Sequence, residues 1–174
     1  MPFTEYFPYR KTLPWIYEIL LAFDVHFWEP GTEATVFRHP EFSFSTPICF
    51  EDVFPWLVRR FVRGGAEVII NLSNDYWSLT DAEAMQHAVH ALFRAVENRR
   101  PLLRATASGL TMEADAWGRI GKRLPFYEEG ILIARPVPGG GHPTLYTRWG
   151  DWFPAAAGFA AAVMLALSLG RRRL

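Results

Sequence analysis

The chain has 174 residues, which is enough for one domain with its own hydrophobic core. Its formal net charge is zero, so it carries no basic field of the kind that binds nucleic acid. Half of the residues are hydrophobic and 16% are aromatic, a composition that suits a protein working at an apolar or interfacial surface. The single cysteine excludes an internal disulfide and any site with several cysteine ligands.

The first third of the chain predicts one short helix followed by two strands. Leu13 to Phe23 is apolar with a proline near its start, which is typical of a helix because the first turn accommodates proline. A turn follows at Glu29 to Thr32. Residues 34–38 and 42–48 are strand candidates, and the second run ends at the single cysteine, Cys49.

The middle of the chain alternates between helical and strand patterns. Val53 to Arg63 has apolar residues at helical spacing and is followed by two glycines, which predicts a helix that ends there. Ala66 to Leu72 is rich in β-branched residues and predicts a buried strand. Asp81 is placed to cap a further helix, Ala82 to Asn98. The predicted apolar stripe of this helix consists of Met85, Val89, Leu92 and Val96.

The next part of the chain predicts three more strands, at residues 102–107, 110–116 and 130–137, with a hairpin turn at Trp117-Gly118. Residues 144–151 then lead into the C-terminal segment. This alternation of strands and helices indicates a layered α/β domain, and it leaves the order of the strands open.

The C-terminal segment has the features of a membrane span. No charge interrupts the stretch from Trp152 to Leu169, which is long enough to cross a hydrocarbon core of about 30 Å at about 1.5 Å per residue. Arg171 to Arg173 follow, and the positive-inside rule places such a cluster in the cytoplasm. The alternative is an alanine-rich helix buried in the core. The span predicts a domain at residues 1–150 on the non-cytoplasmic face and a transmembrane helix with an Arg-rich end at 151–174.

Cys49 is the candidate nucleophile, because it ends a predicted strand and strand ends in α/β folds face the crevices where ligands bind. The attacking species is the thiolate, so the site has to lower the thiol pKa or supply a base. The polar loop Ser73 to Trp77 follows the next strand and is expected at the same edge of the sheet. The carboxylates that are candidates to surround the thiol are Glu5, Glu51, Asp52 and Asp75. The alternative is that Cys49 is a small buried hydrophobic residue.

Other chemistries find less support. His87 and His90 lie three apart on a helix without the further ligands of a known metal motif, so they are expected to be surface or packing histidines. The glycines at 139–141 open no helix and do not predict a phosphate cradle. No Gly-x-Ser-x-Gly motif appears, and the histidines lie outside the loops that follow strands, which disfavours serine-based and Cys–His sites. No cofactor and no metal are expected.

Several motifs resemble those of the bacterial apolipoprotein N-acyltransferases. In chain order the matching segments are Pro2–Pro8 (family pattern PFGE(Y/F)xP), Ile48–Glu51 (ICYE), Asn71–Trp77 (xxSNDxW), Gln86–Arg104 (QH…RAxExxRPxxR), Gly109, and Tyr146–Asp151 (TxYxxxGD). Each match is weak alone, but together they keep the family's order and spacing over nearly the whole chain. The family belongs to the nitrilase-like carbon–nitrogen hydrolases, so the resemblance implies an α-β-β-α sandwich, here its C-terminal part followed by one transmembrane helix.

The resemblance implies a two-step acyl transfer at the bacterial inner membrane, with the catalytic domain on the periplasmic side. Cys49 would attack the acyl ester of a phospholipid and become a thioester. The N-terminal amine of a diacylglyceryl-cysteine apolipoprotein would then take the acyl group. In the same matching, Glu5 and Glu51 stand at the positions of supporting acidic residues.

Part of the family's site has no counterpart in these residues. The general-base glutamate and the oxyanion-stabilising lysine of the family lie upstream of the first motif. Lys11 follows Glu5 and stands at no matching place, while Phe50 and Thr4 replace the family's usual Tyr and Gly. The chain therefore resembles the C-terminal portion of the enzyme, and this polypeptide alone is expected not to turn over.

Two other functions remain open from the sequence. One is a membrane-tethered amidase or nitrilase that uses the same thiol with water as the acceptor. The other is a non-catalytic, membrane-anchored remnant, for which Cys49→Ala would change nothing in cells. If function requires Cys49, the chain belongs to an enzyme and is not a non-catalytic remnant. The acceptor of the acyl group, an amine or water, then distinguishes the acyltransferase from the amidase or nitrilase.

Overall fold

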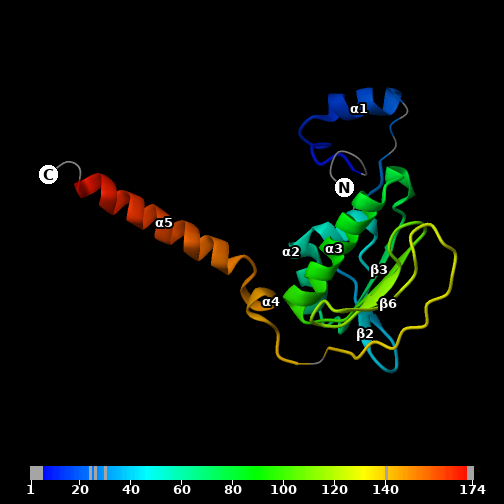
Figure 1. Ribbon diagram of the computed structural model, residues 1–174. Coiled ribbons are helices and arrows are strands. Elements are labelled where there is room, and N and C mark those ends of the chain that lie inside the picture. Colours follow the sequence, from blue (N-terminus) through cyan, green and yellow to red (C-terminus); the bar gives the residue numbers. More distant parts are fainter. Residues whose placement is uncertain (1–5, 24, 26, 30, 140, 172–174) are drawn as a thin grey trace.

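The computed structural model describes residues 6–23, 25, 27–29, 31–139 and 141–171. In chain order its elements, with η marking 3₁₀ helices, are α1 (Pro14–Ala22), β1 (Phe37–Arg38), β2 (Ser43–Ser45), η1 (Cys49–Val53), α2 (Pro55–Arg63), β3 (Val68–Ser73), η2 (Tyr76–Ser78), α3 (Asp81–Asn98), β4 (Leu102–Thr106), β5 (Met112–Ala114), β6 (Ile120–Arg123), α4 (Leu145–Trp149) and α5 (Trp152–Arg171). A mixed sheet forms the centre, α1 lies apart from it, and α5 projects away from the domain (Figure 1).

Within the described residues the sheet joins six strands in the order β1-β2-β3-β4-β5-β6. β2, β3 and β4 are parallel neighbours, and the other pairs are antiparallel. A helix, α2 or α3, connects each parallel pair, because parallel neighbours need a long crossover. The carboxyl ends of β2 and β3 therefore meet at one edge of the sheet, and the parallel bridge between Ile48 and Leu72 extends this pairing to the residue before Cys49.

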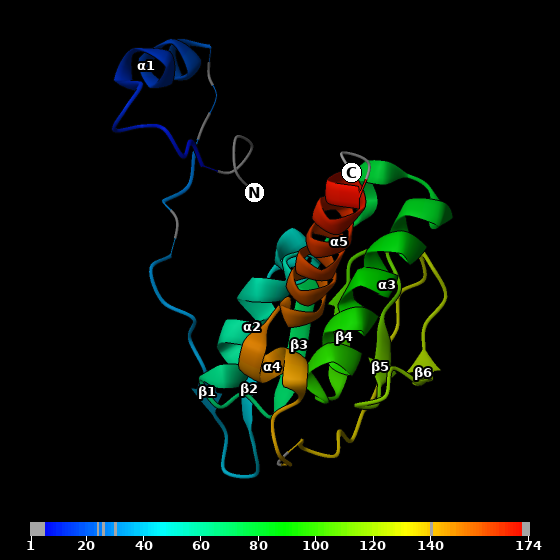
Figure 2. The same cartoon turned by 90° about the vertical axis from the view of Figure 1, so that its left-hand side faces the viewer.

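Helices α2 and α3 pack side by side on one face of the sheet (Figure 2) and bury the main hydrophobic core. The core combines side chains of both helices, the strands and one turn: Val58, Val62, Ala88, Ala91, Ala95, Ile69, Leu102, Met112, Ala114 and Leu110. The alanines of α3 let its backbone approach the strands closely, so that interior packing is dense without large side chains on this helix.

Of the predicted stripe on α3, Leu92 packs against the core, but the other three residues are largely outside it. Met85, Val89 and Val96 are 36%, 37% and 36% exposed. The face toward the sheet instead carries the alanines at 84, 88, 91 and 95, which also recur at helical spacing. The prediction was wrong for these three residues because it favoured large side chains, whereas the residues of α3 in the core are mostly alanines. The cap is also one residue earlier than predicted, since Oγ1 of Thr80 accepts from the Glu83 amide at 3.4 Å.

Two segments of the C-terminal half differ from the predicted strands. Residues 130–137 are extended but form no strand, and Ile131 is 91% exposed. β-Branched residues favour a strand where they pack on a half-buried surface, and this segment has no such surface. The polar segment Ile120–Arg123 does form a strand, β6, because the hairpin turn predicted at Trp117-Gly118 folds it back onto β5. Pairing with a neighbour, rather than composition, decides both outcomes.

The helix predicted over residues 53–63 is confirmed as α2, which begins two residues later than predicted because Val53 ends η1. The 3₁₀ helix η1 starts at Cys49, and α2 begins at Pro55, where proline occupies the first turn. Residues 145–149, expected only to lead into the C-terminal segment, form the short helix α4. Arg59 of α2 holds α4 by donating from Nε to the carbonyl oxygens of Tyr146 and Thr147, both at 3.0 Å.

The C-terminal helix α5 is exposed along its apolar length. Its window Trp152–Leu169 is long and apolar enough to cross a membrane, and none of that window is buried. A core helix would be covered by the rest of the domain, so this alternative does not fit the described residues. The rings of Trp149 and Trp152 lie 6.3 Å apart at the start of α5.

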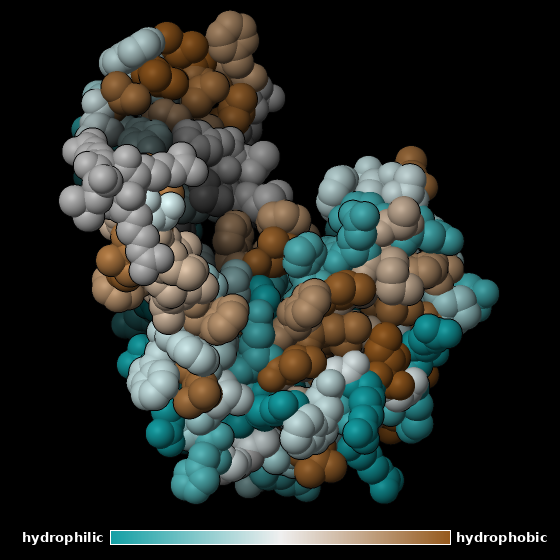
Figure 3. All heavy atoms as spheres, turned by 60° about the vertical axis from the view of Figure 1, so that its left-hand side comes forward, coloured by the Kyte–Doolittle hydropathy of each residue, from teal (hydrophilic) through white to brown (hydrophobic). Residues whose placement is uncertain are grey.

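Helix α1 buries none of its residues and exposes a second set of apolar side chains, among them Trp15 and Ile19. Figure 3 shows this hydrophobic surface at the top of the molecule. Its contacts are local and aromatic: the ring of Tyr17 stacks on Phe27 with centroids 5.5 Å apart. The position of α1 therefore depends on the segment before β1 rather than on the core.

Candidate active site

Cys49 occupies a strained turn at the end of the β2 segment. Its φ is +50°, in the left-handed region, which costs a residue with a side chain roughly 1–3 kcal/mol. Cys49 itself is partly exposed. Such strain persists only where neighbouring groups fix the backbone, and two side chains do so here.

Asn71 and Glu51 hold the two sides of this turn. The Asn71 Nδ2 group donates to the carbonyl oxygens of Pro47, at 3.1 Å, and Cys49, at 3.3 Å. The Glu51 Oε2 atom accepts from the Ile48 amide at 2.8 Å. The chain is thus fixed immediately before and after the thiol.

A buried network of four charged side chains lies behind the turn. Arg104 of β4 donates from Nη1 to Asp52 Oδ2, at 2.7 Å, and from Nη2 to Asp75 Oδ2, at 2.9 Å. His87 of α3 bridges the same carboxylates, with Nε2 at 3.0 Å from Asp52 Oδ1 and Nδ1 at 2.9 Å from Asp75 Oδ1. All four are at most 3% exposed. The network therefore joins four segments at one point: η1, α3, β4, and the loop that follows β3.

The network is electrically balanced. Burial lowers the pKa of His87, but hydrogen bonds to Asp52 and Asp75 outweigh it and raise the pKa to about 9. Burial raises the pKa of Asp75, but hydrogen bonds from His87 and Ser73 and the charge of Arg104 outweigh it and lower the pKa to about 2. At neutral pH an imidazolium and a guanidinium therefore face two carboxylates, as buried charges require.

Two further contacts lock the network in place. Arg94 of α3 donates from Nη1 to the carbonyl oxygens of Asp52, at 3.3 Å, and Val53, at 3.2 Å, which fixes the end of η1. Gly109 lies so close to the Asp75 carboxylate that a Cβ there would stand 1.9 Å from Oδ2. A glycine is needed at this position for steric reasons alone.

The structure brings some of the predicted site residues together and separates others. Cys49 and Glu51 lie in the same turn, and Glu5 lies outside the described residues. Asp52 and Asp75 are near the turn, as expected, but they bind Arg104 and His87 in the interior and are not free carboxylates beside the thiol. The side chain of Glu51 is likewise committed to the Ile48 amide.

Sequence reasoning gave no individual site role to Asn71 or Arg104, and it treated His87 as a surface or packing histidine. One signal for the first two is spacing: Asn71 and Arg104 share a strand face with the core residues Ile69 and Leu102, and they are register partners across β3 and β4. A charged residue on the buried face of a strand needs partners. His87 carries a similar signal, because it lies at helical spacing from the buried alanines at 84 and 91 on α3.

A cavity of about 490 Å³ opens beside the turn. It is lined by Ile48 and Glu51, on either side of Cys49, and by the aromatic side chains of Trp28, Phe54 and Trp56 among others. The lining is mixed, because the charged side chains of Glu29, Glu33 and Arg60 join the aromatic ones, and Cys49 itself does not line the cavity. This cavity is the candidate substrate site, because it contains the neighbours of the thiol.

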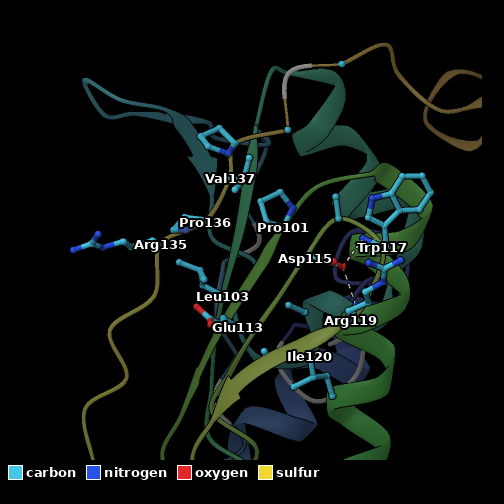
Figure 4. A pocket seen from close by; sticks show the side chains of 16 residues that line it. Pro101, Leu103, Glu113, Asp115, Trp117, Arg119, Ile120, Arg135, Pro136 and Val137 are labelled. Atoms are coloured by element: carbon cyan, nitrogen blue, oxygen red, sulfur yellow. Dashed lines mark hydrogen bonds between the residues drawn. The ribbon is translucent and has the colours of Figure 1, made fainter.

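A larger cavity, of about 690 Å³, lies elsewhere. Figure 4 shows Leu103, Glu113 and Arg135 on its wall. Leu103 and Glu113 are directly opposed on β4 and β5, and their chain neighbours Leu102 and Met112 point into the core. The larger cavity therefore lies on the sheet face that α2 and α3 leave uncovered, and residues of the Cys49 turn do not line it.

Residues 7–136 match the family model described as carbon–nitrogen hydrolase. The chain is 45% identical over 170 residues to apolipoprotein N-acyltransferase 1 of Treponema denticola, covering 97% of this chain and 30% of that protein. It is 34% identical over 174 residues to the apolipoprotein N-acyltransferase of Geobacter metallireducens, covering 100% of this chain and 33% of that protein. The chain thus spans about a third of the length of these relatives.

Two solved structures show the same fold. One is a carbon–nitrogen hydrolase from Helicobacter pylori, with a TM-score of 0.53, 15% identity and coverage of 61% of this chain and 44% of that chain. The other is a variant of the Nesterenkonia AN1 amidase of the nitrilase superfamily, with a TM-score of 0.50, 19% identity and coverage of 62% and 42%. They confirm the predicted nitrilase-like fold class. The chain belongs to the carbon–nitrogen hydrolase family, and within it resembles the apolipoprotein N-acyltransferases.

Proposed function

We propose that Cys49 is the nucleophile of an apolipoprotein N-acyltransferase. The observation that carries the proposal is the Cys49 turn: a partly exposed cysteine in a left-handed conformation at a parallel strand end, whose neighbours Ile48 and Glu51 line a cavity. The relatives' names give the reaction class. The uncovered apolar helix α5 suits an enzyme whose acyl donor is a membrane phospholipid.

The reaction proceeds in two acyl transfers. In the first, the Cys49 thiolate attacks the acyl carbonyl of the phospholipid, a C–S bond forms, the ester C–O bond breaks and the lysophospholipid oxygen takes a proton. In the second, the N-terminal amine of a diacylglyceryl-cysteine apolipoprotein attacks the thioester. The C–S bond breaks, an amide forms, and the amine's proton passes to a base.

The residues of this chain supply the nucleophile and its support. Glu51 accepts a hydrogen bond from the backbone amide of Ile48, the residue before the nucleophile. Glu5 is the supporting acidic residue of the Pro2–Pro8 motif. The family's general-base glutamate and its lysine have no matching residue here, and the chain spans only about a third of its relatives. Residues 1–174 alone therefore do not turn over, whereas a polypeptide that adds an upstream segment with these two groups does.

The domain of residues 1–150 lies on the periplasmic side of the bacterial inner membrane. α5 spans the bilayer, and the basic residues 171–173 lie in the cytoplasm, as the positive-inside rule requires. In this orientation a substrate that arrives from the lipid surface can reach the cavity beside Cys49 and the exposed apolar side chains of α1.

The test is acyl transfer in phospholipid vesicles to a synthetic diacylglyceryl-cysteine lipopeptide. We compare residues 1–174 with the same chain extended by the upstream segment of the Treponema denticola relative. The extended protein is expected to form the N-acyl lipopeptide, and Cys49→Ser is expected to abolish the product, because an alcohol is far less ionised than a thiol.

Two outcomes would overturn the proposal. If the extended protein releases free fatty acid or hydrolyses amides without acylating the lipopeptide, the acceptor is water and the enzyme is a hydrolase. If the extended protein shows neither reaction and Cys49→Ser changes nothing in cells, the chain is not a catalytic part at all. No gain of acyl transfer on adding the upstream segment would also contradict the assignment of the missing groups.

A further inference from the structure

The side chain of Asn71 lies under the Cys49 turn and makes contacts on both of its sides. It stands on β3, is fully buried, and is the register partner of Arg104 on β4. Its Nδ2 group donates to the carbonyl oxygens of Pro47 and Cys49, at 3.1 and 3.3 Å. One amide group therefore bridges the last residues of the strand segment and the nucleophile itself.

Arg104 determines which way the Asn71 amide points. Its Nη1 group donates to Asn71 Oδ1, so the oxygen faces the cation and the nitrogen faces the two carbonyl groups. A half-turn of the amide would place its NH₂ group against the guanidinium and its oxygen against both carbonyl oxygens, and every contact would become repulsive. Asp52 and Asp75 in turn hold Arg104, so the orientation is fixed by the buried network.

We propose that Asn71, oriented by Arg104, is a positioning residue for the Cys49 thiol; this rests on the proposed role of Cys49 as nucleophile. The amide does not touch the reacting atoms. It holds the carbonyl of Cys49 and thereby keeps the residue in its left-handed conformation, which determines where the thiol lies. A nucleophile displaced by 1 Å loses much of its rate, and Asn71 prevents that displacement.

Asn98 offers a matched control within the same fold. It is also fully buried, donates from Nδ2 to the Arg94 carbonyl oxygen at 3.0 Å, and accepts at Oδ1 from Thr147 Oγ1 at 2.9 Å. Its partners lie at the junction of α3 and α4 and not in the Cys49 turn. If Asn71 were purely structural, removing its NH₂ group should have the same effect as removing that of Asn98: a loss of stability without a change in the reactivity of Cys49.

The experiment compares Asn71→Asp with Asn98→Asp in the full chain in phospholipid vesicles and in the extended protein. Asn71→Asp keeps an acceptor for Arg104 and loses the two donated bonds; Asn71→Leu, which is neutral and of similar size, separates this loss from the added charge. The readouts are the thermal unfolding temperature, the rate of Cys49 alkylation by iodoacetamide, and kcat and KM for acyl transfer. Alkylation needs no acyl transfer, so it decides the positioning role even where the proposed function fails.

In both Asn71 variants, the rate at which iodoacetamide alkylates Cys49 is expected to change. The kcat for acyl transfer is expected to fall by about 100-fold, with KM nearly unchanged. Asn98→Asp is expected to lose stability without changing either rate. The positioning role is overturned if the Asn71 variants react like the unmodified protein, or if Asn98→Asp changes the rates equally. It is also overturned if neither Asn71 variant folds, because Asn71 would then be structural.

Discussion

Arg104 donates a hydrogen bond of 2.7 Å to Asp52 and so connects the central strand β4 to the turn that carries Cys49. The two residues are 52 positions apart in sequence, and both are almost completely buried. An ion pair of this kind is costly to bury, and its value lies in the geometry that it imposes on the turn.

Replacing Arg104 by Met is expected to destabilise the protein by roughly 3–5 kcal/mol, because the buried Asp52 and Asp75 would lose one of their two cations and keep only His87. Urea unfolding followed by circular dichroism measures the change. Arg63→Met is the control, since Arg63 is exposed at the end of α2 and its loss is expected to cost no more than roughly 0.5 kcal/mol. Equal effects of the two substitutions would show that the network does not support the fold.

His87 predicts a loss of stability in the alkaline range. Its pKa is raised in the folded protein from 6.5 to about 9, so the folded state binds the proton more tightly than the unfolded state. The stabilisation is complete below pH 6.5 and disappears as the pH rises through about 9. Unfolding free energies measured between pH 6 and 10 should show this decline, and His87→Gln should flatten it. An unchanged decline in that variant would assign the titration to another group.

Gly109→Ala is expected to destabilise the protein by roughly 1–3 kcal/mol, because the new methyl group would overlap the Asp75 carboxylate and displace it from Arg104. The thermal unfolding temperature measures the effect. Gly31→Ala is the matched control, since a Cβ there meets no atom within 4 Å. If both variants unfold at the same temperature, the close contact at Gly109 is not a constraint.

The fold was largely predictable where the sequence pattern matches a local structural rule. The strand before Cys49, the strand before the loop Ser73–Trp77 and the helix crossover between them follow from short-range patterns, and parallel pairing then brings the two strand ends together. The Asp52–Arg104–Asp75–His87 network was not predictable, because its members come from four separate segments. Spacing along the chain does not specify which buried charges meet.

The errors in the predicted elements have related causes. The stripe Met85, Val89, Leu92 and Val96 was predicted on α3 because large apolar side chains usually face a core, but only Leu92 of these packs against it, and alanines fill most of the buried face. Residues 130–137 have strand propensity but no neighbour to pair with, while polar β6 has one. Both errors concern tertiary context, which local propensity does not contain.

α5 predicts that the protein stays with membranes after alkaline carbonate washing. Ala161 lies near the middle of the apolar window, so Ala161→Arg is expected to oppose insertion by roughly 2.5–3.5 kcal/mol and to shift protein into the soluble or aggregated fraction. Ala161→Leu, which keeps the helix apolar, should remain in the membrane pellet. Release of the unmodified chain by carbonate would contradict a spanning helix.

The central claim is that Cys49 carries the acyl group, and the mass of the peptide that contains Cys49 tests it most directly. The protein extended by its upstream segment is incubated with phospholipid vesicles without an acceptor, digested, and analysed by mass spectrometry. The account predicts a gain of one acyl chain on this peptide, removed by hydroxylamine, which cleaves thioesters. A Cys49 peptide that stays unmodified in this incubation would contradict the account if the same protein acylates the lipopeptide in a parallel assay, because the acyl group would then pass through another residue.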